Sequence, residues 1–350
     1  MPDCKVTVVV PSYNVERFLS QCLDSLIKQT YIFHKVIVVN DGSKDKTGEI
    51  AEKYAKDYPD IIKYISQENK GLGAARNVGL KQVDTEYVMF LDSDDWLVPN
   101  YMEILNERLQ EENEKPDLIY TLPKVYDMAT GLYSDWMDKP LFDELFDRPG
   151  VVINPKVDKR IYELEPNACR KVYSLEFLKS QNFMFPEGTK WEDVEPHFQL
   201  LHASARCIGE GRIGFCYRIN SGGQITSSTG RDRLQVVSVF GRALQYAFRN
   251  NWTDEEIAYI LHMLLSFAKW SMDCISIFIR KELVESLHDL YNSIPKKYMV
   301  VYYKIFRVSR KDKLLLRLIK SPFYRILGNA YTYKNGKKFL SKAKRIIKRR

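Results

Sequence analysis

The sequence predicts a doubly wound α/β domain with a mostly parallel sheet, followed by a smaller helical region. Three observations support this prediction. Short apolar runs alternate with amphipathic helical stretches in the first hundred residues, polar residues follow each run, and only helical patterns remain beyond residue 226. With 350 residues, 45% of them apolar and 28% charged, the chain is typical of a globular protein with more than one domain.

Each strand expected in the first domain is a nearly continuous apolar run, which is typical of parallel strands covered on both faces. We expect these strands at residues 5–10, 35–39, 61–65 and 87–91. We expect the helices between them at residues 15–26, 47–58 and 74–81. A helix that joins two parallel strands is a crossover connection, so repeated units build a doubly wound sheet.

Polar side chains follow the expected strands, at the edge where ligands of such sheets bind. They are Ser12, Tyr13, Asn14, Asp41, Gln67, Asn69, Asp92, Asp94 and Asp95. The chain has no GxGxxG or P-loop motif after the first strand, so a nucleotide would be held by side chains. The three acidic residues after the fourth strand could bind Mg²⁺ or Mn²⁺, although a simple acidic turn is an alternative. Tyr13 could likewise be packing, and Asp41-Gly42 a plain turn.

Five motifs occur in order along the chain. They are Pro11-Ser-Tyr-Asn14, Asn40-Asp-Gly-Ser-Lys-Asp45, Asn69-Lys-Gly-Leu-Gly-Ala-Ala-Arg-Asn-Val-Gly79, Leu91-Asp-Ser-Asp-Asp-Trp96 and Trp191-Glu-Asp193. In this order and spacing they resemble the motifs of family 2 glycosyltransferases, which have the GT-A fold. The resemblance covers about residues 5–226 and implies a nucleotide-sugar-binding domain.

The resemblance also implies a donor site for a UDP-sugar. Tyr13 would stack on uracil and Asp41 would accept its N3–H, while Arg76 would bring a positive charge to the nucleotide. Asp92 would bind the ribose hydroxyls, and Asp94 would hold a divalent cation, Mn²⁺ or Mg²⁺, that bridges the diphosphate. Further donor-site residues expected from the motifs are Pro11, Ser12, Asn14, Asn69, Ser93 and Asp95.

The Glu192-Asp193 pair matches the catalytic motif of the family. The resemblance implies that Asp193 deprotonates the acceptor hydroxyl, which attacks the anomeric carbon from the face opposite the leaving diphosphate, so the configuration inverts. The alternative is an acidic helix N-terminus that favours the helix dipole.

Other residues receive weaker assignments. The segment with Arg218 and Thr226 resembles a loop that closes over the donor diphosphate. Lys171 and Trp191 are candidates for acceptor binding, with packing as the alternative for Lys171. We expect His197, four residues beyond the base, to be a buried structural histidine.

The sequence divides into a catalytic domain at residues 1–226, a helical domain at 227–295 and a basic tail at 296–350. We expect helices at residues 234–249, 254–279 and 281–293, with Thr253 as a cap. The apolar stretch Ile257–Ile279 contains His262, Lys269 and Asp273, which favours a buried helix over a membrane span.

The C-terminal residues 281–350 contain 20 Lys and Arg but 4 Asp and Glu, whereas the whole chain has a net charge of +8. This amphipathic, basic region suits an anionic membrane surface. A solvated basic face is the alternative, and nucleic acid is disfavoured because no recognition module accompanies the charge. The six cysteines show no zinc or disulfide spacing, and the N-terminus lacks a signal peptide pattern. We therefore expect a cytoplasmic protein, peripheral on the inner face of the membrane.

The expected activity is inverting, metal-dependent transfer of a sugar from a UDP-sugar to a hydroxyl of a growing, lipid-linked bacterial surface glycan. Direct transfer to polyprenyl phosphate is a second possibility, because the same donor site could serve it. A non-catalytic nucleotide-sugar-binding scaffold is a third, which the presence of Asp92, Asp94 and Asp193 disfavours. The oligomeric state stays open, although the helical region could supply an interface.

Overall fold

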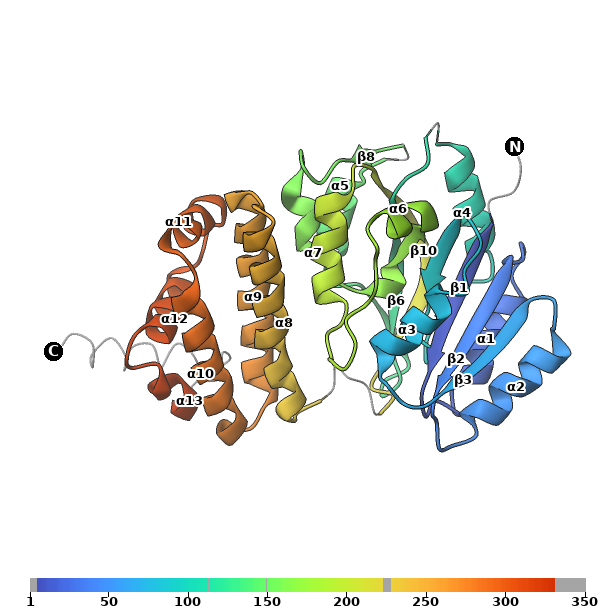
Figure 1. The fold of residues 1–350 in the computed structure, drawn as a ribbon, viewed down its shortest axis with the longest axis horizontal. Helices are drawn as coiled ribbons and strands as arrows, with labels where there is room; N and C mark the ends of the chain where they lie inside the picture. Colours follow the sequence, from blue (N-terminus) through green and yellow to red (C-terminus); the bar gives the residue numbers. More distant parts are fainter. Residues whose placement is uncertain (1–4, 113, 149, 223–227, 331–350) are drawn as a thin grey trace. The chain divides into compact units, whose positions relative to one another are not determined.

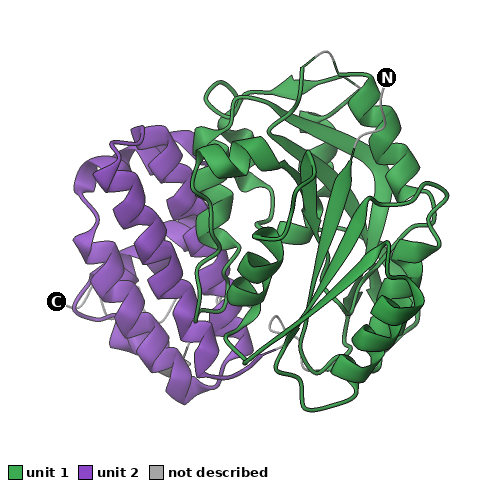
Figure 2. Ribbon diagram, turned by 45° about the vertical axis from the view of Figure 1, so that its right-hand side comes forward, with its two compact units in different colours: residues 1–224 green, residues 225–350 purple. Residues whose placement is uncertain are grey.

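The computed structural model describes residues 5–112, 114–148, 150–222 and 228–330. The chain divides into two compact units, residues 1–224 and residues 225–350 (Figure 2). The first unit has the α/β pattern that the sequence predicts, and the second is helical (Figure 1).

Unit 1 is built on one ten-stranded mixed sheet with helices packed on it. Its strands are β1 (Val6–Ser12), β2 (Lys35–Asp41), β3 (Ile62–Gln67), β4 (Tyr87–Phe90), β5 (Trp96–Leu97), β6 (Leu118–Asp127), β7 (Leu132–Asp135), β8 (Val152–Ile153), β9 (Lys171–Ser174) and β10 (Cys207–Ile219). Its helices are α1 (Leu19–Ile27), α2 (Thr47–Asp57), α3 (Leu72–Leu80), α4 (Tyr101–Gln110), α5 (Lys139–Leu145), α6 (Leu175–Ser180), α7 (Val194–Ala203) and the short 3₁₀ helices η1 (Lys159–Glu163) and η2 (Ala168–Arg170).

The strand order is β3-β2-β1-β4-β9-β6-β10-β5. Strands β1 to β4 are parallel, which confirms the predicted doubly wound half of the sheet. Strand β9 runs antiparallel to both β4 and β6, and the register pairs Met89 of β4 with Val172 and Tyr120 of β6 with Lys171. The start of β9 therefore lies at the carboxyl end of β4, beside the edge where the predicted site residues gather.

The two faces of the parallel strands are covered by different helices. Helix α1 buries an apolar stripe in the same core as Val8 and Val10, whereas Gly79 of α3 lies against Val9. Because successive strand residues point to opposite faces, α1 and α3 cover opposite sides of the sheet. Gly79 is required at this contact, since a Cβ there would lie 2.3 Å from Val9 Cγ1.

Helix α1 begins at Leu19, four residues later than the sequence predicts. The preceding segment is held by the loop after β2. The backbone N–H of Asn14 donates to Ser43 Oγ (3.0 Å), and that of Val15 donates to Thr47 Oγ1 (2.8 Å). The backbone N–H groups of residues 14 and 15 therefore have hydrogen-bond partners without being part of a helix. Apolar periodicity does not reveal such bonds, so it predicts a helix start that is too early.

Unit 2 consists of helices. They are the 3₁₀ helix η4 (Arg231–Leu234), α8 (Gln235–Arg249), α9 (Asp254–Cys274), α10 (Ile277–Ser293), α11 (Lys296–Ile305), α12 (Arg310–Lys320) and α13 (Arg325–Ala330). Thr253 caps α9 as the sequence predicts, and it forms a capping box with Glu256. The predicted helix at 254–279 is too long, because the backbone of Ile275 is extended (ψ 157°) and α9 ends at Cys274. Arg280 then donates to the carbonyls of Met272 (2.9 Å) and Ile275 (3.0 Å) at this end of the helix.

The sequence predicts a separate tail from residue 296, and the structure differs there. Helix α11 contacts α9, and α12 and α13 contact α10, so residues 296–330 belong to unit 2. The apolar face of α12 is buried in this unit, through Leu315, Leu316, Leu318 and Ile319. Residues 331–350 of the predicted tail lie outside the described residues. Among the described residues, the structure contains no helix that combines the length and apolar character needed to cross a membrane.

We predict that Gly79→Ala destabilises unit 1 by about 1–3 kcal/mol, because the added methyl group overlaps Val9. The matched control is Gly241→Ala on α8, where the nearest atom to the new Cβ is Leu290 Cδ1 at 3.6 Å. This control should be neutral or stabilising by up to about 1 kcal/mol, because alanine is the better helix former. Thermal unfolding followed by circular dichroism measures both. Equal melting temperatures for Gly79→Ala and the wild type would contradict the prediction.

Candidate active site

The first part of the site lies where β1 and β2 end. Pro11 and Ser12 are buried at the end of β1, and Tyr13 follows with 46% of its surface exposed. Asn14 has a left-handed backbone (φ 50°), and its side-chain oxygen accepts a hydrogen bond from Lys44 N at 2.9 Å. The two loops are therefore fixed to each other, and the Tyr13 ring is available to a planar ligand.

Asp41 is buried and holds the loop that leads to α3. Its carboxylate accepts hydrogen bonds from Gln67 Nε2 (2.6 Å), Lys70 N (2.9 Å) and Gly71 N (2.8 Å). Its backbone carbonyl accepts a bond from Asn69 Nδ2 at 3.0 Å. Asp41 and Asn69, which the sequence predicts as donor-site residues, thus shape the loop themselves.

Arg76 on α3 joins the two halves of the site. Its side chain is 1% exposed, and Nη1 lies 2.7 Å from Glu192 Oε1 and 2.6 Å from Asp193 Oδ1. Nη2 lies 2.9 Å from Asp92 Oδ1. Burial opposes the charge of this guanidinium, but the three carboxylates raise its pKa well above the usual value, so Arg76 stays charged. The sequence predicts that Arg76 faces the nucleotide, whereas the structure directs its guanidinium at the protein's own carboxylates.

The direction of Arg76 is set by a segment more than a hundred residues away. Asn77, its neighbour on α3, donates to Phe185 O (2.9 Å) and accepts from Phe185 N (2.8 Å). The Arg76 guanidinium lies over the Phe185 ring, 5.2 Å from its centre. A Cβ at Gly73 would lie 2.2 Å from Pro186 O, so only glycine permits this close approach.

Glu192 and Asp193 follow Trp191, whose left-handed backbone (φ 64°) is unusual for a bulky residue. Glu192 is buried, and burial, with the neighbouring charge of Asp193, raises its pKa to about 7 against the opposing effect of Arg76. Asp193 directly precedes α7, but its side chain makes no capping bond there. Its Oδ2 instead accepts a hydrogen bond from Ala168 N at 3.1 Å, which weakens the alternative of a simple helix N-terminus.

The acidic turn after β4 is held from the other side by Arg218. The backbone N–H of Arg218 donates to Asp95 Oδ1 (2.8 Å), and its Nε donates to the Asp94 carbonyl (2.7 Å). The guanidinium is packed over the rings of Trp96 (4.6 Å) and Phe18 (4.7 Å). In the structure Arg218 therefore braces this turn, whereas the sequence predicts that it closes over a diphosphate. Thr226, its predicted companion, lies outside the described residues.

The charges of the site are suited to a divalent cation. Five carboxylates gather around two guanidinium groups; they belong to Asp92, Asp94, Asp95, Glu192 and Asp193. Burial raises the pKa of Asp95 well above its usual value, and the charges of Asp94 and Asp92 raise it further. In the described part of the chain, no three acidic, histidine or cysteine side chains are arranged to hold a metal alone. The residues fit a cation that takes one or two carboxylates and completes its shell with ligand phosphates.

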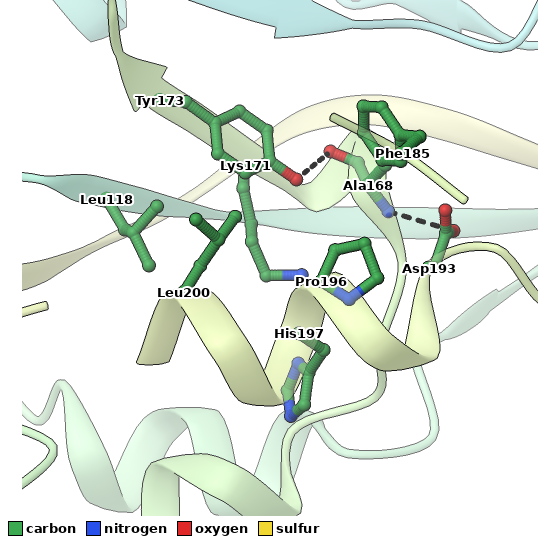
Figure 3. A pocket seen from close by; sticks show the side chains of 9 residues that line it. All are labelled: Leu118, Ala168, Lys171, Tyr173, Phe185, Asp193, Pro196, His197 and Leu200. Atoms are coloured by element: carbon green, nitrogen blue, oxygen red, sulfur yellow. Dashed lines mark hydrogen bonds between the residues drawn. The ribbon is translucent and has the colours of Figure 1, made fainter. Parts of the chain in front are cut away.

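A small cavity of about 10 Å³ lies beside Asp193, close to the least volume that holds a water molecule (Figure 3). Lys171, at its wall, is 4% exposed and donates from Nζ to Asn167 O at 2.9 Å. Burial, with the neighbouring charge of Arg170, lowers its pKa to about 8. His197 is buried, with Nε2 3.1 Å from Tyr162 O, and burial lowers its pKa well below the usual value. This environment is that of the structural histidine that the sequence predicts.

Sequence reasoning missed Ala168, Tyr173 and Phe185, which all line this cavity. Apolar and aromatic residues carry no chemical signature that separates a site from a core. The pairing of β9 with β4 and β6 brings Ala168 and Tyr173 to Asp193, and the bonds between Asn77 and Phe185 bring in Phe185.

The burial of Lys171 predicts a pH-dependent stability. The folded chain releases the Lys171 proton near pH 8, whereas an unfolded lysine keeps it to about pH 10. Between these values the unfolded state binds more protons, so the wild type should gain stability over Lys171→Met, on the order of 1 kcal/mol per pH unit. Urea unfolding at pH 7 to 10 measures the difference, with the exposed Lys81→Met as control. A difference that stays constant with pH would contradict the prediction.

Known proteins resemble this chain in sequence and in fold. The family model described as glycosyl transferase family 2 matches residues 7–146. Glycosyltransferase GlyA of Streptococcus pneumoniae is 33% identical over 228 residues, which cover 63% of this chain and 31% of GlyA. Poly(ribitol-phosphate) beta-N-acetylglucosaminyltransferase TarS of Staphylococcus aureus is 26% identical over 307 residues, which cover 84% of this chain and 50% of TarS. The aligned part of the chain thus spans half or less of these two relatives.

Solved structures share the fold. The crystal structure of S. aureus TarS 1–349 in complex with UDP-GlcNAc matches with a TM-score of 0.71 and 22% identity. The match spans 93% of this chain and 90% of that TarS chain. A mannosyltransferase from Pyrobaculum calidifontis in complex with GDP-Man and Mn²⁺ has a TM-score of 0.51 and 15% identity, covering 94% of this chain and 86% of its own. Residues 7–146 therefore match glycosyl transferase family 2, and the chain shares the fold of these solved structures, the GT-A fold.

Proposed function

We propose that this protein transfers a sugar from a UDP-sugar to a hydroxyl of a growing, lipid-linked bacterial surface glycan, with inversion and with a divalent cation. One observation carries the proposal. Arg76 connects Asp92, in the acidic turn where a donor would bind, to Glu192 and Asp193, where a base is expected. A single displacement reaction requires the donor and the base to lie close together. Here one guanidinium contacts a residue from each side.

The donor would lie along the carboxyl ends of β1, β2 and β4. The exposed ring of Tyr13 would stack on uracil, and Asp41, beside it, would accept the N3–H through an unused lone pair. Asp92 would bind the ribose, and Asp94 would hold the cation with the diphosphate oxygens. The crystal structure of TarS 1–349 contains UDP-GlcNAc, which supports a UDP-sugar donor for this chain.

Asp193 would act as the general base. Its side chain is 19% exposed, and each oxygen already accepts one hydrogen bond, from Arg76 and from Ala168. A carboxylate has further lone pairs, so an acceptor hydroxyl can still donate its proton to it. The cation, when bound, would stabilise the negative charge on the departing UDP. Arg76 contacts both Asp193 and Asp92, so the proposed base and the proposed ribose-binding residue are held close together.

For the acceptor, the name of TarS states that it acts on poly(ribitol-phosphate), a polymer with many hydroxyl groups. This supports a hydroxyl-rich polymer as the acceptor class here. We further propose that the protein works at the inner face of the membrane, held by basic residues of its C-terminal region. This attachment would be electrostatic, because the apolar face of α12 is buried in unit 2.

Donor hydrolysis tests the donor and the cation together. In a panel of UDP-, GDP-, CDP- and dTDP-sugars, we expect slow cleavage of one UDP-sugar with Mn²⁺ and loss of cleavage with EDTA. A GDP-sugar preference would contradict the proposed donor, and full activity in EDTA would contradict the cation. Transfer assays with hydroxyl and polyprenyl phosphate acceptors, read by mass, then separate the two acceptor classes.

Replacing the base tests the mechanism. Asp193→Asn should lower the rate of sugar transfer by roughly 10²–10⁴-fold, because the amide cannot take the acceptor proton. UDP binding by calorimetry should change by less than about threefold, since Asp193 contacts the acceptor side. Asp84→Asn, at an exposed carboxylate, is the matched control and should behave as the wild type. Normal transfer by Asp193→Asn would show that another group acts as base.

A further inference from the structure

The short turn η2 and the residue before it, Asn167, lie beside the proposed base. One oxygen of Asp193 pairs with Arg76, and the other accepts the backbone N–H of Ala168. The direction of the second bond depends on how the peptide groups of Asn167 and Ala168 are oriented. Two buried side chains from the next strand, β9, hold these peptide groups by their carbonyl oxygens.

Tyr173 holds the first carbonyl. Its hydroxyl donates to Ala168 O at 3.1 Å, and the side chain is 3% exposed. Figure 3 shows the resulting chain of contacts, in which the Tyr173 hydroxyl bonds to the Ala168 carbonyl while the Ala168 amide bonds to Asp193. The ring also packs edge-on against Phe90 of β4 (5.6 Å between ring centres), so the hydroxyl is fixed by the sheet.

Lys171 holds the second carbonyl. Its Nζ donates to Asn167 O at 2.9 Å, and the ammonium lies 5.1 Å from the centre of the Tyr120 ring. The Asn167 side chain accepts the N–H of Cys169 at 2.7 Å, which closes the turn. Because Lys171 is buried, its ammonium contacts this turn and not an acceptor molecule that arrives from solvent.

We propose that Tyr173 and Lys171 are positioning residues for the transfer reaction, which act on Asp193 through the Asn167–Arg170 turn. The inference rests on the proposed function, because it assumes that Asp193 is the base. Neither side chain needs to touch substrate. Each fixes one carbonyl of the turn whose amide orients the Asp193 carboxylate, and small errors in the placement of a base lower the rate strongly.

The main test is Tyr173→Phe, which removes one hydroxyl and keeps the ring. We expect kcat for sugar transfer to fall about tenfold or more, while the donor KM and the UDP affinity stay within about twofold. The matched control is Tyr120→Phe. The Tyr120 hydroxyl is buried and has no hydrogen-bond partner among the described residues, so its removal should leave kcat unchanged.

The split between kcat and binding separates positioning from a general loss of structure. A looser turn should lower kcat while the donor KM, the UDP affinity and the melting temperature stay near the wild-type values. A merely structural loss would lower the melting temperature and the UDP affinity together with kcat.

Lys171→Met provides a second, independent variant should Tyr173→Phe fold poorly. It should lower kcat in the same way, and the double variant should lose less than the product of the two single losses, because both act on one turn. An unchanged kcat in both variants, or a parallel loss of UDP affinity, would overturn the inference. If Asp193→Asn is inactive and the two positioning variants are normal, only this inference fails. If Asp193→Asn is active, the proposed base fails first and the inference with it.

Discussion

The buried guanidinium of Arg76 is the interaction on which the site depends. A guanidinium that is 1% exposed must keep its charge paired, because an isolated buried charge is very unfavourable. One partner, Asp92, lies in the turn after β4, 16 positions further along the chain. Another, Asp193, lies just before α7, 117 positions further along the chain. Displacement of either segment would take at least one carboxylate away from the buried guanidinium. The electrostatics thus favour one arrangement of segments that are otherwise distant in the chain.

The carboxylates of the site outnumber its guanidinium groups. One guanidinium cannot neutralise three carboxylates, and burial already raises the pKa of Glu192 to about 7. On the other side of the acidic turn, Arg218 lies over the rings of Phe18 and Trp96 and donates to the Asp94 carbonyl. The site therefore retains an excess of negative charge in the absence of ligands. A divalent cation bound at the acidic turn would reduce that excess.

The sheet has two parts with different tasks. The parallel strands β1 to β4 bring the polar residues that follow them to one edge, as the alternation of apolar runs predicts. The antiparallel strand β9 pairs with β4 and β6, and the turn before it bonds to Asp193. Because β9 is only four residues long, its sequence shows no alternation that would distinguish it from a loop or a buried helix segment.

The sequence alone determined the fold class, the strands β1 to β4 and the residues that gather at their ends, because hydrophobic periodicity and short polar motifs are local properties. It also named Asp92, Asp94, Glu192 and Asp193 through a family resemblance. The tertiary structure decided where the side chains point. Arg76 turned toward carboxylates, which no local pattern can reveal, since a guanidinium reaches in any direction from its helix. The role of Tyr173 likewise appeared only once strand pairing brought its hydroxyl to the Ala168 carbonyl, because hydrogen bonds between distant segments depend on register and not on composition.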